Sequence, residues 1–189
     1  MQSKTDKNHR RMRVSDYGAM IALAFIFSYL ESLIPLPFGI PGIKLGLANL
    51  VVVLAISHFG NKTAVIVGIV RIILVGFSFG NLSAMLYSLA GGILSLCVMI
   101  VLKRTGKFHV IGVSLAGGVF HNLGQLLVAI RVLDTGKLVY YAPVLMAAGV
   151  VTGGLIGFAA NGMQPVIRKW EQLMSSGSVK KENDSTLNK

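Results

Sequence analysis

The sequence predicts an all-α integral membrane protein in which six transmembrane helices form a compact bundle, with both termini in the cytoplasm. Hydrophobic residues make up 53% of the 189 residues and charged residues 13%, against about 25% charged residues in soluble domains. Most apolar runs approach the ~20 residues with which a helix crosses a bilayer. We therefore expect one membrane domain at 15–165, between a basic cytoplasmic tail at 1–14 and a polar, disordered cytoplasmic tail at 166–189.

Six apolar runs, taken in chain order, account for the six expected helices. The first ends at Pro35, because three prolines and two glycines between 35 and 42 do not fit a regular helix. The second is the shortest, and the third carries Arg71 near its middle. A basic loop at 103–107 separates the fourth from the fifth. The expected helices span about 16–34, 43–59, 63–79, 81–102, 110–132 and 139–163.

The distribution of lysine and arginine predicts the orientation of the bundle. With the N-terminus inside, 14 of the 18 basic residues lie in cytoplasmic segments, three lie in outer segments, and Arg71 lies within a span. This asymmetry follows the positive-inside rule and places residues 35–42 outside. It also attributes the net charge of +11 to membrane topology, so we expect no nucleic-acid partner.

Polar side chains within or at the edges of the apolar runs are the strongest functional signal. A charge at the bilayer centre is unfavourable by roughly 2.5–3.5 kcal/mol on insertion scales, so such residues usually face a cavity or one another. In the predicted topology they gather in the outer half, which indicates a substrate-binding pocket that opens outward. The candidate residues are Glu31, Lys44, Asn49, Arg71, Asn81, His121, Asn122 and Gln125.

Each candidate also has a structural explanation. Asn49 and Asn81 are placed to cap helix starts or to bond across helices, and an isolated His121 is more often packed than ligand-binding. His121 and Gln125 are four residues apart and share one helix face.

The charged candidates have structural alternatives as well. Glu31 and Lys44 flank the same loop and are placed to form an ion pair at its rim. Arg71 keeps its charge at any accessible pH and needs a partner at its depth, so a structural pair with Glu31 is the main alternative to ligand binding. Three cations or donors (Lys44, Arg71 and His121) favour a ligand with an anionic or polar head.

Rows of small residues predict close helix packing. Gly149, Gly153 and Gly157 form a continuous G-x-x-x-G row in the sixth span, and the fifth span carries small residues at the same spacing. We interpret these rows as contacts inside the bundle. Gly18 and Ala22, near the cytoplasmic end of the first span, are instead candidates for docking a partner.

Catalytic motifs are absent from the sequence. It holds no Asp-rich diphosphate motif, no P-loop, no Ser-His-Asp or Cys-His set, and no histidines at metal-ligand spacing. The single Cys97 cannot form an internal disulfide. We therefore expect no catalysis by this chain alone, no metal and no cofactor.

Two segments resemble signatures of a known family. Residues 31–50, ESLIPLPFGIPGIKLGLANL, and residues 117–125, GGVFHNLGQ, are similar to those of the Gx transporter family, also called heptaprenyl diphosphate synthase component I. That family in turn resembles the substrate-binding S components of energy-coupling factor (ECF) transporters. The resemblance covers about residues 14 to 170. It implies a six-helix bundle that binds a small molecule near its outer face.

The resemblance also implies partners. S components dock on a membrane T component that carries two cytoplasmic ATPases, often through an Ala-x-x-x-Ala stripe on the first helix, for which Gly18 and Ala22 are the nearest match here. The function expected from the resemblance is capture of a small molecule or polar-headed lipid precursor at the outer face of a bacterial cell membrane, among membrane lipids. The alternative that the family name implies is a membrane subunit that assists a soluble prenyl diphosphate synthase in heptaprenyl diphosphate or quinone synthesis. Similar members are also associated with flavin- and quinone-linked extracellular electron transfer.

Overall fold

The computed structural model describes residues 14–33 and 46–187, with side chains up to residue 169. Every regular element in this part of the chain is helical, which confirms the all-helical prediction. A π-helical turn, η1 (Ala55–Phe59), extends α2, and a 3-10 turn, η2 (Gly136–Tyr141), leads into α6. The six α-helices are α1 (Val14–Leu33), α2 (Leu47–Leu54), α3 (Asn61–Ser78), α4 (Leu82–Thr105), α5 (Val110–Val132) and α6 (Ala142–Leu187).

Five of these six helices are long and apolar enough to cross a membrane, and α2 is the exception. The eight residues of α2 and the five of η1 rise about 20 Å at 1.5 Å per residue, less than the ~30 Å hydrocarbon core. The prediction of six spanning helices is therefore only partly confirmed. The helix starts later than the expected Ile43, after Gly46, whose left-handed backbone (φ 76°) precedes the first helical residue.

α2 is largely buried within the bundle. Its residues Val51–Leu54 and the following Ala55 and Ile56 are all shielded from the surface. A helix that is apolar on every side packs inside a protein, and α2 contacts α1, α3 and α6. In η1, the Ile56 carbonyl accepts a hydrogen bond from Lys103 Nζ of α4, which ties the end of this short helix to its neighbour.

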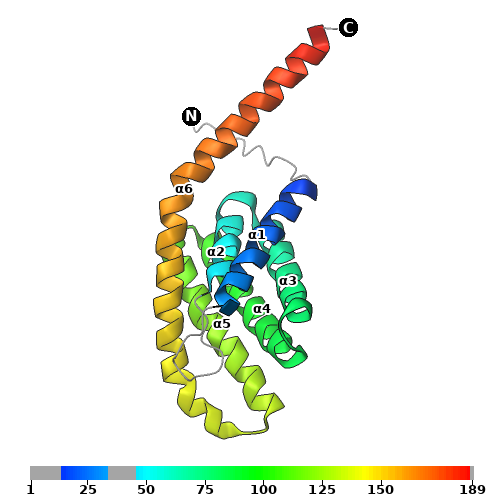
Figure 1. Ribbon diagram of the computed structural model, residues 1–189. Coiled ribbons are helices and arrows are strands. Elements are labelled where there is room, and N and C mark those ends of the chain that lie inside the picture. The colour runs from blue at the N-terminus through cyan, green and yellow to red at the C-terminus, as the bar shows by residue number, and fades with distance from the viewer. Residues whose placement is uncertain (1–13, 34–45, 188–189) are drawn as a thin grey trace.

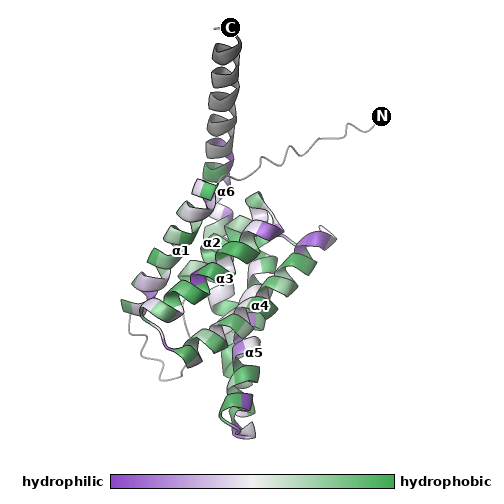
Figure 2. Cartoon of the chain, turned by 90° about the vertical axis from the view of Figure 1, so that its right-hand side faces the viewer, coloured by the Kyte–Doolittle hydropathy of each residue, from purple (hydrophilic) through white to green (hydrophobic). Residues whose placement is uncertain are grey.

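The helices form a closed ring. Each packs on the next in the order α1, α3, α4, α5, α6, α2 and back to α1. In Figure 1 the α3–α4 and α5–α6 connections lie at the lower end of the bundle, where α1 also ends. The α2–α3 and α4–α5 connections lie at the upper end, where α1 begins. Figure 2 shows hydrophobic residues along most of the bundle, with hydrophilic residues concentrated at its two ends.

The seam between α5 and α6 is the most extensive helix contact in the described residues, and glycines make it possible. A methyl group added at Gly149 would lie 2.8 Å from the Gly118 carbonyl oxygen, and one at Gly153 would lie 2.7 Å from the Ser114 carbonyl oxygen. Ser114 Oγ also donates to the Gly153 carbonyl at 2.7 Å. The glycine row therefore packs inside the bundle, as the sequence predicts.

The C-terminal boundary differs from the expectation. α6 continues as one helix through Leu187 and passes Pro165 without ending, whereas the sequence predicts a disordered tail from residue 166. In Figure 1 this part of α6 extends well beyond the other helices. The expected basic tail at 1–14 lies outside the described residues except for Val14, the first residue of α1.

Candidate functional site

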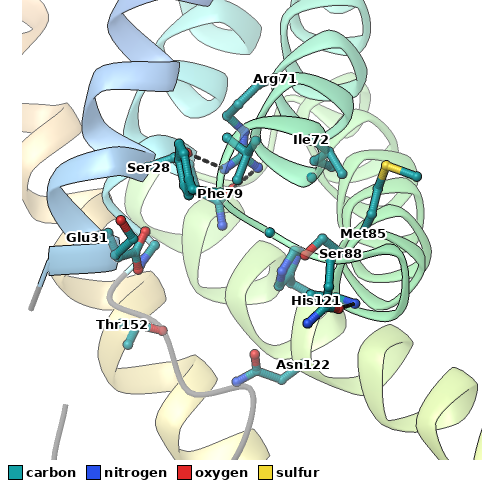
Figure 3. Close-up of a pocket in the computed structure, with 18 of the residues that line it drawn as sticks. Ser28, Glu31, Arg71, Ile72, Phe79, Met85, Ser88, His121, Asn122 and Thr152 are labelled. Atoms are coloured by element: carbon teal, nitrogen blue, oxygen red, sulfur yellow. Dashed lines mark hydrogen bonds between the residues drawn. The ribbon is translucent and has the colours of Figure 1, made fainter. Parts of the chain in front are cut away.

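A cavity of about 470 Å³ lies within the ring, at the end where α1 stops and α4 starts. Side chains from all six helices line it, and Figure 3 shows them converging from opposite sides. Six of the eight candidate residues line this cavity, namely Glu31, Asn49, Arg71, Asn81, His121 and Asn122. The sequence prediction therefore placed most of these residues around one space. Lys44 lies outside the described residues.

Arg71 projects from the middle of α3 into the cavity wall between α1 and α2. Its guanidinium donates to Ser28 Oγ at 3.5 Å and to Asn49 Oδ1 at 3.3 Å. Both acceptors are neutral, and both bonds are at the long end of the range for N–H donors. The Arg71 Nε atom is buried and has no hydrogen-bond partner among the described residues.

Glu31, near the end of α1, fixes the start of α2. Its Oε1 accepts from the backbone N–H of Gly46 at 2.5 Å. Within the described part of the chain Glu31 forms no direct ion pair with Arg71, although its charge is near enough to attract the guanidinium. In place of the Arg71–Glu31 pair that the sequence allows as the structural alternative, a Ser28–Arg71–Asn49 network joins α1, α3 and α2.

His121 and Gln125 share one face of α5, as their spacing predicts, but only His121 lines the cavity. Gln125 Nε2 lies 3.0 Å from His121 Nε2, and because an amide nitrogen only donates, the ring nitrogen is the acceptor. Gln125 contacts His121 and is not among the described residues that line the cavity, so its role in substrate binding stays a prediction. α4 approaches closely at this point, since a methyl group at Gly91 would lie 2.8 Å from Gln125 Cγ.

The amide candidates hold helices in place while they face the cavity. Asn122 is buried, and its Nδ2 donates to the Leu145 carbonyl of α6 at 2.7 Å. Asn81 caps α4, because its Oδ1 accepts from the Ala84 N–H at 2.7 Å. These contacts are the capping and cross-helix bonds that the sequence allows as alternatives.

Apolar side chains also line the cavity. They include Phe79, at the end of α3, and Met85, in the first turn of α4. Phe79 also stacks on two aromatic side chains of α1, with ring centroids 5.5 Å from Phe25 and 5.8 Å from Tyr29. The cavity lining therefore combines charged and amide groups with apolar side chains, one of which is a supported aromatic ring.

Sequence reasoning missed several lining residues. Ser28 precedes Glu31 by three residues on the same helix face, so its position was available from spacing alone. Ser32 and Ser88 carry no signal in the sequence, because isolated serines are common in membrane helices. Thr152 and Phe79 enter the wall only through the packing of α6 and of the α3–α4 turn.

The expected docking residues lie away from the cavity. Gly18 and Ala22 are exposed on the outer face of α1, and a methyl group added at Gly18 would meet nothing within 4 Å. Ala24 and Ser28, on the opposite face, are buried against the bundle. The two small-residue rows of α1 are therefore separated, with one facing inward and one open to the surroundings.

Comparison with known proteins identifies one relationship. The family model described as heptaprenyl diphosphate synthase component I matches residues 20–163, which cover nearly all of the bundle. No curated protein and no solved structure matches the chain.

Proposed function

The chain belongs to the heptaprenyl diphosphate synthase component I family, and from this premise we propose that it is the substrate-binding membrane subunit of an ECF-type transporter. It captures a small molecule or a polar-headed lipid precursor and performs no chemistry on it. The single observation that carries the proposal is the cavity of about 470 Å³ lined by every helix of the ring. This volume lies within the range of about 300–1,000 Å³ that is usual for small-molecule sites.

The polar residues of the wall support binding rather than a purely structural role. Arg71 is held only by neutral acceptors, and its Nε has no partner in the described residues. A charge in an apolar span that served only packing would be expected to have a close counter-ion. The lysine and arginine distribution supports an orientation in which the cavity end faces outward.

Energy for uphill transport must come from partners under this proposal, because the sequence has no P-loop. The exposed Gly18–Ala22 face of α1 is the proposed docking surface for the T component. Small residues let helices approach closely in lipid, and this face is not used by the bundle itself.

The family description favours a second candidate function. Under it, the chain presents a lipid substrate to a soluble prenyl diphosphate synthase subunit, and the two proteins co-purify. The same cavity serves both functions, so the partner rather than the ligand distinguishes them.

The test is affinity purification of the full chain from its native membrane, with bound small molecules identified by mass spectrometry. We expect the T component and its ATPases to co-purify with the wild type. Gly18→Leu should abolish this complex and leave the bound ligand unchanged, because Gly18 is exposed and a β-carbon added there meets nothing within 4 Å. Ala159→Leu, at an exposed position of α6, is the matched control and should retain the complex.

Recovery of a soluble prenyl synthase without the ATPases would establish the second function. Recovery of neither partner, with ligand flux persisting in proteoliposomes of the chain alone, would refute both.

A further inference from the structure

The structure carries a further inference about the ligand, which rests on the proposed function. We propose that the cavity selects a small amphipathic anion, whose carboxylate or phosphate group binds Arg71 and whose apolar body packs against Phe79 and Met85. The proposal follows from the unmet donor capacity of Arg71, the engagement of Glu31 elsewhere and the apolar side chains that line the same cavity.

Arg71 has more hydrogen-bonding capacity than the protein uses. A guanidinium carries five N–H donors in a planar fork, and here two long bonds go to the neutral oxygens of Ser28 and Asn49. Nε is buried without a partner in the described part of the chain. Arginine does not shed its proton, so this side chain retains both a positive charge and donors suited to an oxyanion.

Glu31 does not satisfy that requirement. Its Oε1 is held by the Gly46 N–H at 2.5 Å, at the start of α2. It attracts Arg71 only through the electric field and makes no direct contact with it. A ligand oxygen that approaches Arg71 from the cavity therefore does not compete with a carboxylate of the described residues. Arginine forks match carboxylate and phosphate oxygens in two parallel bonds.

The charges of the described lining residues favour an anionic group beside Arg71. Arg71 and Glu31 are the charged side chains among these residues, and Glu31 is engaged by the Gly46 N–H. A cationic group near Arg71 would be repelled. The charge pattern thus favours an oxyanion placed at the Arg71 side.

Apolar lining residues define the other half of the ligand. Phe79 and Met85 both line the cavity, and in Figure 3 Phe79 lies beside Ser28 and Arg71 while Met85 lies on the other side, near Ser88. Phe79 is supported by Phe25 and Tyr29, so it offers an aromatic surface in a set position. Apolar and aromatic bodies gain from burial against such a surface by area and by ring stacking.

The test uses a matched set of probes on the purified full chain in detergent, with binding measured by ligand-observed saturation-transfer NMR. Benzoate and phenyl phosphate carry the oxyanion, benzyl alcohol is neutral, benzylamine is cationic, and acetate lacks the ring. We expect at least one of the two aromatic anions to bind at least tenfold more tightly than the alcohol or the amine. Binding of benzoate alone assigns a carboxylate, binding of phenyl phosphate alone assigns a phosphate, and binding of both supports the shared chemistry.

Variants tie the binding to named residues. Arg71→Gln should weaken the anionic probes roughly ten- to hundredfold, the range for loss of a charged hydrogen-bond partner. Arg71→Lys should weaken them less, because the charge remains while the fork is lost. Arg104→Gln, an exposed arginine in the last turn of α4, is the control and should change nothing. Phe79→Leu should weaken benzoate severalfold and leave acetate unaffected.

Several results would overturn the proposal. They are benzylamine binding as tightly as benzoate, anion binding that survives Arg71→Gln, and no binding of any probe to the wild type. If Arg71→Gln does not fold, the order of the probes on the wild type and on Phe79→Leu decides the question. A complex with the ATPases that carries a neutral or cationic native ligand would leave the proposed function intact and refute this inference alone.

Discussion

Asn122 illustrates how a single side chain in this protein both holds the bundle together and faces the cavity. Its amide nitrogen donates to the Leu145 carbonyl of α6, and the residue also lines the cavity wall. Asn49 and Asn81 behave similarly, through a bond from Arg71 and through the cap of α4. Binding and packing are therefore coupled at the residue scale. A loss of binding in any of these variants is interpretable only with a measurement of stability beside it.

Glu31 gives a prediction at this scale, because its bond to Gly46 and its charge can be separated. Glu31→Ala removes the acceptor for the Gly46 N–H and should lower stability by about 1–3 kcal/mol. Glu31→Gln keeps an acceptor oxygen, so we expect a distinctly smaller loss. The measurement is the unfolding midpoint of each variant in detergent. An equal loss in both variants would mean that the charge opposite Arg71, rather than the bond to Gly46, stabilises this region.

Helix packing determines where the cavity opens and where the bundle is closed. α5 and α6 meet backbone to backbone along the row that contains Gly149 and Gly153. α4 and α5 also meet through glycines, since a methyl group at Gly124 would lie 2.8 Å from Gly91 Cα. These tight seams bring α4, α5 and α6 together as one wall. α1 and α3 complete the ring beside the short α2, whose length leaves room for the cavity at its start.

The α5–α6 seam predicts opposite effects for the same substitution at two glycines of one helix. Gly153→Ala would place a methyl group 2.7 Å from the Ser114 carbonyl oxygen and 3.0 Å from Leu115 Cα. Both neighbours are backbone atoms that cannot move aside, so we expect a loss of about 1–3 kcal/mol. Gly162→Ala meets nothing within 4 Å, and should gain up to about 1 kcal/mol of helix propensity.

Unfolding of both variants by titration with sodium dodecyl sulfate in mild detergent is the appropriate measurement. Equal stabilities for Gly153→Ala and Gly162→Ala would show that α5 and α6 do not approach as closely as these distances indicate.

At the scale of the whole molecule, the five long apolar helices and their many exposed large hydrophobic side chains indicate a multi-pass membrane protein. The α4–α5 turn lies at the end of the bundle away from the cavity, and η2 lies on the cavity side. The cavity therefore opens either to the outside of the cell or to the cytoplasm, depending on the orientation of the bundle in the membrane. The positive-inside rule favours the orientation with the cavity outside.

Cysteine labelling on whole cells tests that orientation. Two single cysteines, each in a Cys97→Ala background, mark the opposite ends of the bundle. Lys137→Cys lies in η2, and Thr105→Cys lies at the end of α4. An impermeant maleimide should label Lys137→Cys on intact cells and Thr105→Cys only after the membrane is permeabilised. The reverse pattern would place the cavity on the cytoplasmic side and rule out capture from outside.

The sequence alone was sufficient to determine the class of fold and to name six of the residues that line the cavity. Because a helix needs about 20 apolar residues to cross a bilayer, the apolar runs predict helices. Because a charge in the membrane is unfavourable, Arg71 and Glu31 within or at the end of those runs indicate a functional or structural role. α5, at Val110–Val132, matches its predicted bounds because its turns are marked by basic and polar residues at both ends. The close packing of the glycine row of α6 was also predictable, since in lipid such a row typically lets two helices approach closely.

Only the tertiary structure decided which partners those residues take. Arg71 bonds Ser28 and Asn49 rather than pairing with Glu31, and Gln125 reaches back to His121 instead of entering the cavity. Spacing along a helix defines a face, but the rotation of each helix in the ring determines what that face meets. The start of α2 also depends on tertiary structure, because it follows the left-handed Gly46, whose N–H is bound by Glu31 of α1. The place of Phe79 in the cavity lining was likewise not predictable from the sequence, since an aromatic residue near a turn acquires its role only from the helices that pack around it.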